Sequence, residues 1–186
     1  MKKLKTLIVI SLLIISCKKD SSVSSINILV NSSFETNLNQ PDYSGWTGTA
    51  YIIDTAGNIF DPIVQDAPSG GGLWSLQLEP GWIPSEGYSE THISGLSGTH
   101  TIELSAWMKS INWTGSISLE HWRNGQKIKY KTIADNPSQW KQITLIDTLT
   151  LLMTDTITVH LSAGWTEVAS GRVLYDLVKL LTTKQQ

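Results

Sequence analysis

Apolar and polar residues alternate with a period of two along much of this chain. The clearest stretch is residues 101–109, where apolar side chains occupy every second position: Ile102, Leu104, Ala106 and Met108. Residues 116–120, 156–161 and 172–180 alternate in the same way, the last less regularly. Successive side chains of a β-strand point to opposite faces, so the pattern predicts strands with one buried face. No stretch shows the sustained period of an amphipathic helix.

Glycine, proline and asparagine separate the alternating stretches. Residues 68–72 and 79–84 are rich in glycine and proline, and Asn136 precedes Pro137. Asn124-Gly125 is the strongest hairpin signal, because both residues tolerate the positive φ of a tight two-residue turn. Short strands about ten residues apart predict a single all-β sandwich domain without internal repeats.

The first 25 residues differ in character from this domain. Lys2, Lys3 and Lys5 precede an apolar run over residues 7–15, and Ser16-Cys17 follows. This order is typical of a secretory signal, and a cysteine at the cut resembles a bacterial lipoprotein signal. The apolar run is too short to cross a bilayer, which needs about 20 residues. A buried N-terminal element or an uncleaved anchor is the alternative.

These features give the expected boundaries. Residues 1–16 are a signal peptide, 17–25 are the lipidated Cys17 and a tether, 26–182 are the domain and 183–186 a short tail. The protein is then lipid-anchored to a bacterial membrane, expected to be the outer membrane. Lys18, Lys19 and Asp20 resemble a surface-export signal with little acidic character, so the cell surface and the periplasmic face both stay open.

The charge of the chain argues against nucleic-acid binding, and its cysteine content excludes disulfide bonds within the domain. The chain has 14 basic and 16 acidic residues, a net charge of −2. Cleavage would remove three lysines and leave −5, without the basic stripe of a nucleic-acid-binding protein. Cys17 is the only cysteine, so the domain folds without disulfides. Packing alone must stabilise it, which is feasible at this length.

Several segments resemble carbohydrate-binding modules of the four/nine type with the galactose-binding-like jelly-roll fold. They are residues 27–35 followed by Gly45-Trp46, residues 104–109, Trp140, and residues 173–180. The resemblance spans residues 26–181 and departs from the family at Ser32, where glycine is usual, and at Leu177, where a second aspartate is usual. It implies a two-sheet jelly-roll β-sandwich with eight main strands: 73–78, 88–93, 101–109, 116–122, 126–133, 140–146, 156–161 and 172–180.

In a jelly roll these strands pair first with last, second with seventh, third with sixth and fourth with fifth. One sheet then contains the second, seventh, fourth and fifth strands. If Ile157, Val159 and Leu161 face the core, the opposite, concave face carries polar and aromatic side chains: Tyr88, Glu90, His92, Ser118, Glu120, Trp122, Thr158 and His160. Among these, Trp122, Glu120 and His160 are candidate ligand contacts.

The same topology gathers alternate loops at one end of the sandwich. Trp82, Trp113 and Trp165 fall in three such loops, where large apolar rings are unusual. Stacking on a sugar ring would explain them, with Glu86, Asn112 and Glu167 binding the hydroxyl groups. The alternative is that they close the open end of the core. The other strand-associated tryptophans, Trp46, Trp74, Trp107 and Trp140, are expected to be structural.

The resemblance also implies a structural calcium ion. Glu35 and Asp176 match positions that often bind one, and residues 70–72 could add backbone carbonyls, since calcium takes six to eight oxygen ligands. Leu177 removes one possible oxygen. Alternatively, both carboxylates accept backbone hydrogen bonds.

Together these features predict non-catalytic glycan binding at the cell envelope, near a partner enzyme or transporter. The four histidines lack metal-ligand spacing, and no nucleophile elbow, phosphate loop or dinucleotide motif is present. A structural or protein-interaction role is the main alternative. A glycan-active hydrolase is a weaker one, because it needs two carboxylates facing each other across a cleft.

Overall fold

The computed structural model describes residues 27–36, 40–48, 52–53, 59–60, 63–79, 87–164 and 171–185. The expected signal peptide, Cys17 and the tether lie outside this range. So do four candidate contacts of the loop end: Trp82, Glu86, Trp165 and Glu167. Among the described residues, no helix is long and apolar enough to cross a membrane.

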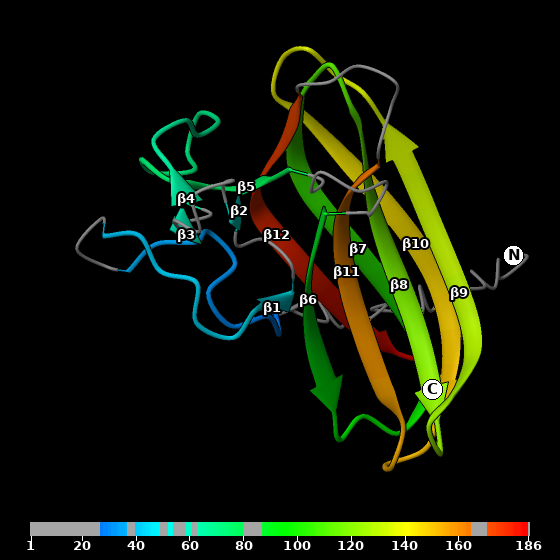
Figure 1. Ribbon diagram of the computed structural model, residues 1–186. Helices are drawn as coiled ribbons and strands as arrows, with labels where there is room; N and C mark the ends of the chain where they lie inside the picture. The colour runs from blue at the N-terminus through cyan, green and yellow to red at the C-terminus, as the bar shows by residue number, and fades with distance from the viewer. Residues whose placement is uncertain are drawn as a thin grey trace, which may run out of the picture.

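The described residues form an all-β sandwich (Figure 1). The front sheet has the order β1-β6-β11-β8-β9, and the back sheet has the order β10-β7-β12-β5-β4. The strands of the front sheet are β1 (Thr47–Gly48), β6 (Gly87–Ser94), β8 (Thr114–Arg123), β9 (Gln126–Asp135) and β11 (Thr156–Gly164). Those of the back sheet are β4 (Ile63–Val64), β5 (Ser75–Leu78), β7 (Gly98–Ile111), β10 (Lys141–Leu151) and β12 (Arg172–Lys184). A separate hairpin pairs β2 (Ile52–Ile53) with β3 (Ile59–Phe60).

The predicted jelly-roll pairing is confirmed. β5 pairs with β12, β6 with β11, β7 with β10 and β8 with β9, all antiparallel. The front sheet also joins β11 to β8, as the jelly-roll order requires. Alternation alone did not identify the very short strands β1 to β4, because two residues contain no measurable period.

The core lies between the two sheets and consists of the alternating apolar side chains. Ile102, Leu104 and Met108 of the back sheet meet Ile117 and Leu161 of the front sheet in one buried cluster. Tyr175 is fully buried there, and its hydroxyl lies 2.6 Å from the carbonyl oxygen of Ser162 and 3.0 Å from that of Ser116. A back-sheet tyrosine thereby reaches two front-sheet carbonyls. The front sheet is held against a rigid core, so its outer face presents a fixed surface.

Candidate functional site

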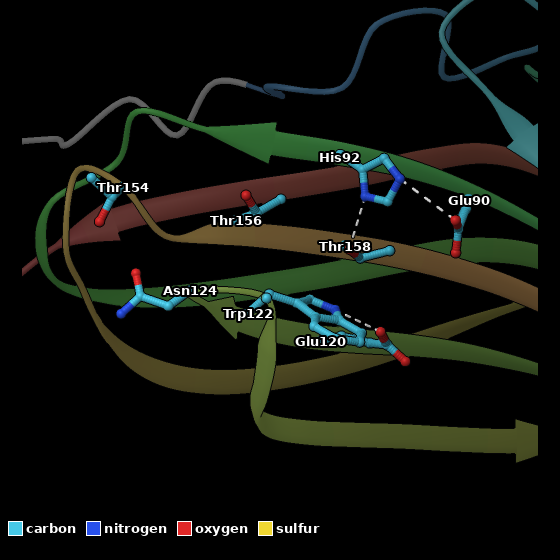
Figure 2. Close-up of a pocket in the computed structure, with 9 residues that line it drawn as sticks. Glu90, His92, Glu120, Trp122, Asn124, Thr154, Thr156 and Thr158 are labelled. Atoms are coloured by element: carbon cyan, nitrogen blue, oxygen red, sulfur yellow. Dashed lines mark hydrogen bonds and ion pairs between the residues drawn. The ribbon is translucent and has the colours of Figure 1, made fainter.

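An open pocket of about 390 Å³ lies on the outer face of the front sheet, where β8 turns into β9 (Figure 2). Three adjacent strands and two turns line it. The lining residues are Glu90 and His92 of β6, Glu120 and Trp122 of β8, Thr156 and Thr158 of β11, Asn124 and Gly125 of the β8–β9 hairpin, and Thr154 of the β10–β11 turn.

Strand register explains why these residues meet. Thr158 of β11 lies opposite Glu120 of β8 on one side and His92 of β6 on the other. The intervening residues Ile157 and Val159 are buried in the core. One row of side chains therefore packs inward while the next forms the pocket floor. The shared face expected from alternation is thus present in the structure.

Trp122 is held in place by a buried carboxylate. Its indole N–H donates a hydrogen bond of 2.8 Å to Oε2 of Glu120, two residues earlier on the same face. Glu120 is only 8% exposed, and its other oxygen accepts a 2.5 Å hydrogen bond from Nζ of Lys127. With both carboxylate oxygens engaged, the indole has one preferred orientation beside the pocket.

Glu90 is the centre of a second polar group on the same face. His92 Nε2 lies 3.5 Å from Oε1 of Glu90, and His160 Nδ1 lies 3.4 Å from Oε2. His92 also contacts the Thr158 hydroxyl through Nδ1 at 2.9 Å (Figure 2). The His160 ring stacks on Tyr88, with centroids 5.1 Å apart and planes 11° apart. His160 thus lies next to the pocket and supports Glu90 from outside it.

An ion pair between the buried Asp155 and the partly exposed Arg123 anchors the turns at the end of the pocket. Asp155 is 3% exposed and accepts hydrogen bonds from Arg123, His121 and the backbone N–H of Leu152. The Arg123 guanidinium is the main reason why the pKa of Asp155 is well below its usual range. Asp155 follows Thr154, and Arg123 precedes Asn124, so this pair fixes the β10–β11 turn against the β8–β9 hairpin.

We expect Arg123→Gln to lower the thermal unfolding midpoint by roughly 5 °C or more. The ionised Asp155 carboxylate would lose its charged partner while staying buried. The folded-state pKa of Asp155 is depressed, so this stabilisation is present above about pH 4 and is lost as the pH falls further. Calorimetry of both proteins across that range checks this prediction.

Lys141→Gln is the matched control, because Lys141 bonds Asp135 at 2.6 Å on the surface, with 60% of its side chain exposed. Surface ion pairs of this kind contribute little. An equal midpoint shift in the two variants would contradict a special role for Arg123.

The described residues of the loop end do not form an exposed aromatic cluster. Trp113 is 6% exposed and belongs to the core cluster. Gly171 lies so close to its indole that a Cβ would stand 2.7 Å from the ring, so the ring packs under the start of β12. Asn112 is exposed and occupies the β7–β8 turn at φ 63°. Trp113 therefore packs into the core, which was the alternative to ligand contact, and it does not present a ring face to a ligand.

The other tryptophans divide between core and sheet surface. Trp46 is 4% exposed and packs against Phe34 with ring centroids 5.3 Å apart. Trp74 packs partly buried against the core. Trp140 donates its indole N–H to Oδ1 of Asp66 at 3.1 Å. Trp122 is thus the tryptophan that lines the pocket, among the described residues.

Glu35 and Asp176 come together on the outer side of the back sheet. A register shift between Asp176 and Lys179 interrupts β12, with Leu177 at φ 47°. Asp176 is fully buried, its Oδ1 accepts the Leu177 N–H, and its Oδ2 has no hydrogen-bond partner. Burial, with the nearby Glu35 charge, raises the pKa of Asp176 to about 8.

Gly71 and Gly72 complete the surroundings of these carboxylates. A Cβ on Gly71 would collide with Oδ2 of Asp176, and one on Gly72 with the Glu35 carboxylate. The backbone N–H of Leu73 also donates to Glu35 at 3.2 Å. An orphaned carboxylate oxygen beside a second carboxylate fits a cation. The described residues contain no cluster of three or more histidine, cysteine, aspartate or glutamate side chains suited to a metal, so backbone or water oxygens would have to complete the ligand set.

Some pocket residues could not be identified from alternation. It places Glu90, His92 and Thr158 on the face, but it does not single out Thr154 or Asn124, which belong to turns. The relevant signal is the Asn124-Gly125 hairpin, which indicates a turn without indicating that the turn borders a pocket.

Comparison with known proteins finds similar folds among solved structures. No family model and no curated protein matches the sequence. A tailspike domain of bacteriophage CBA120 matches 85% of the chain at 14% identity and a TM-score of 0.60, although the chain covers only 22% of that protein. A Stig cyclase from Fischerella sp. TAU matches 88% of the chain at 12% identity and a TM-score of 0.59, over its full length.

Carbohydrate-binding modules are also among the matches. A family 16 carbohydrate-binding module matches 83% of the chain and 99% of its own length, at 17% identity and a TM-score of 0.57. A xylan-binding domain from Paenibacillus barcinonensis matches 80% of the chain and 92% of its own length, at 16% identity and a TM-score of 0.51. At such identities the likeness concerns the fold. The chain therefore has the jelly-roll β-sandwich fold that these carbohydrate-binding modules share.

Proposed function

We propose that this domain binds a glycan without catalysing its cleavage, through the pocket on the outer face of the front sheet. The observation that carries the proposal is the pairing of a fixed indole, Trp122, with hydroxyl, imidazole and carboxylate groups on one open face. The fold likeness to carbohydrate-binding modules, one of them named as xylan-binding, supports it.

The chemistry of the face suits a sugar chain. A pyranose ring has a face of C–H bonds that lies flat on an indole, and burying about 100 Å² there contributes on the order of 2.5 kcal/mol. The hydroxyl groups of the sugar need directional partners, which Glu90, His92 and Thr158 supply. Their mutual hydrogen bonds orient these groups before a ligand arrives, which lowers the entropy cost of binding.

Binding without catalysis fits the contacts of the two pocket carboxylates, both of which are already paired with neighbouring side chains. Glycoside hydrolysis uses one carboxyl group as an acid and a second as nucleophile or base. Glu120 is engaged by Trp122 and Lys127, and Glu90 is bracketed by His92 and His160. Both are therefore better placed to orient neighbours and bind hydroxyl groups than to transfer protons to a glycosidic bond.

Isothermal titration of the folded domain against neutral xylans, arabinans and galactans and against amino-sugar glycans tests the proposal. We expect saturable binding to at least one of them, with the polysaccharide recovered intact. Absence of binding throughout the panel would contradict glycan recognition. Release of reducing ends, lost on replacing Glu90, would indicate a hydrolase. Glycan-independent capture of one envelope protein would support the interaction role.

Two further features belong to this proposal. Lipidation of Cys17 would hold the domain at the membrane and close to an envelope enzyme or transporter, as the signal sequence suggests. Glu35 and Asp176 would hold a structural calcium ion whose charge offsets that of the two carboxylates. The orphaned oxygen of Asp176 supports the calcium assignment.

A further inference from the structure

An ammonium group of the protein itself lies beside the pocket, against two of its lining residues, Glu120 and Trp122. Nζ of Lys127 lies 5.1 Å from the centroid of the Trp122 ring and 5.0 Å from that of the Tyr130 ring. It also donates a hydrogen bond to Glu120. Two aromatic faces and one carboxylate thus surround a single cation. We call Glu120, Trp122 and Tyr130 the ammonium cage.

The cage belongs to the same face as the pocket. Tyr130 of β9 lies directly opposite Glu120 of β8, and Lys127 lies opposite Trp122. Glu120 and Trp122 line the pocket themselves. A ligand in the pocket would therefore meet the cage side by side with the Glu90 group.

The cage is accessible from solvent. The Lys127 side chain is 40% exposed and Tyr130 is 53% exposed, so neither is locked into the core. The Lys127 end of the ion pair is open to solvent, whereas Glu120 is 8% exposed, so this carboxylate needs a charged partner beside it. Lys127 can therefore leave the cage when another cation takes its place, because Glu120 then keeps a charged partner and the exposed lysine loses only a modest cation–π contact.

The charge of the lining favours a cation over an anion. Glu90 and Glu120 are both in the described lining, and that lining contains no lysine or arginine. In the cage a sugar carboxylate or sulfate would meet the Glu120 carboxylate, whereas a primary amine would pair with Glu120 and contact two aromatic rings.

We propose that the ammonium cage is a subsite for an amino sugar, occupied in the free protein by Lys127 as an intramolecular competitor. The inference rests on the proposed glycan-binding function. It adds the ligand class: a glycan with unacetylated hexosamine units, whose protonated amine takes the place of Nζ of Lys127 while the sugar rings lie over the Trp122 side of the pocket.

The test compares two probes with the same sugar backbone: the trimer of glucosamine, which carries protonated amines, and its fully N-acetylated counterpart, in which each amine is a neutral acetamide. Each is titrated into wild type and Lys127→Met in mildly acidic buffer. We expect the substitution to tighten glucosamine-trimer binding by roughly five- to twenty-fold, because the competitor is gone. Binding of the acetylated trimer should change less than about twofold.

Two control variants separate competition from charge. Lys129→Met removes the same charge from the same strand, but Lys129 pairs with Asp147 at 2.7 Å, on the other side of β9. It should leave both affinities unchanged. Lys127→Arg keeps a cation that can occupy the cage and should bind the glucosamine trimer no more tightly than wild type.

Equal effects on the two trimers, no effect of Lys127→Met, or the same gain from Lys129→Met would each overturn the inference. If wild type still binds a neutral polysaccharide in that case, the proposed glycan-binding function stands and only the amino-sugar subsite fails. If no glycan of any kind binds, the proposed function itself fails.

Discussion

Replacing Trp122 by alanine is expected to weaken glycan binding by roughly sixty-fold, the equivalent of losing about 2.5 kcal/mol of ring stacking. The substitution should leave the domain folded, because Trp122 is only half-buried and lies on the outer face. Glu120 keeps its hydrogen bond from Lys127, so no buried carboxylate is left without a partner. Titration calorimetry measures the binding loss, and the thermal midpoint confirms folding.

Trp140→Ala is the matched control for this experiment. Trp140 is also partly exposed and also donates its indole N–H to a carboxylate, but it does so at Asp66, which is bonded by Lys109 of the back sheet. Its loss should leave glycan affinity unchanged. Equal losses in the two variants, or retained binding in Trp122→Ala, would remove Trp122 from the site.

The metal-free protein is expected to lose several kcal/mol of stability as the pH rises from about 4 to about 8, because burial raises the pKa of Asp176 to about 8. In the unfolded chain Asp176 ionises near pH 4, whereas in the folded protein it holds its proton up to about pH 8. The folded state binds more protons in that window, so rising pH favours unfolding by up to about 1.4 kcal/mol per pH unit.

Calcium should reverse this loss. A divalent cation beside Glu35 and Asp176 replaces the proton and stabilises both ionised carboxylates, so its affinity should increase as the pH rises through the pKa of Asp176. Calorimetric scans with calcium, with magnesium and with chelator, each at several pH values, measure the effect. We expect a calcium-specific rise in the unfolding midpoint that is largest at the alkaline end.

The Asp176→Asn variant tests whether the ionisation of Asp176 causes both the pH dependence of stability and the response to calcium. It removes the ionisable group, so the metal-free variant should be more stable than wild type at pH 8 and should respond little to calcium. A wild-type midpoint that is unaffected by calcium at every pH would contradict the metal assignment. A metal-free stability that does not fall with pH would contradict the raised pKa.

The alternation of apolar and polar residues predicts the fold of this chain, because the alternating apolar side chains form the core between the two sheets. Ile157 and Val159 point inward on β11, which fixes Thr158 on the outer face and, through register, sets it opposite Glu120 and His92. A shift of one residue would expose the apolar row, so register is strongly determined.

The direction of loop side chains is not determined in the same way. Trp113 stands beside the β7–β8 turn, and its sequence neighbours do not say whether the ring points outward. Its burial depends on Gly171, which approaches from a distant segment. Likewise, Thr154 and Asn124 meet at the pocket because the ion pair between Asp155 and Arg123 joins their turns. Such contacts between distant segments have no periodic signature in the sequence.

The most direct test of the central claim is amide chemical-shift mapping of the domain during titration with the tightest-binding oligosaccharide. The outer-face site predicts that the largest shifts cluster at His92, Glu120, Trp122 and Thr158, with little change at Asn112, Trp113 and Gly171. Shifts concentrated at those three residues instead, with the pocket residues unmoved, would place the glycan at the loop end and contradict the account.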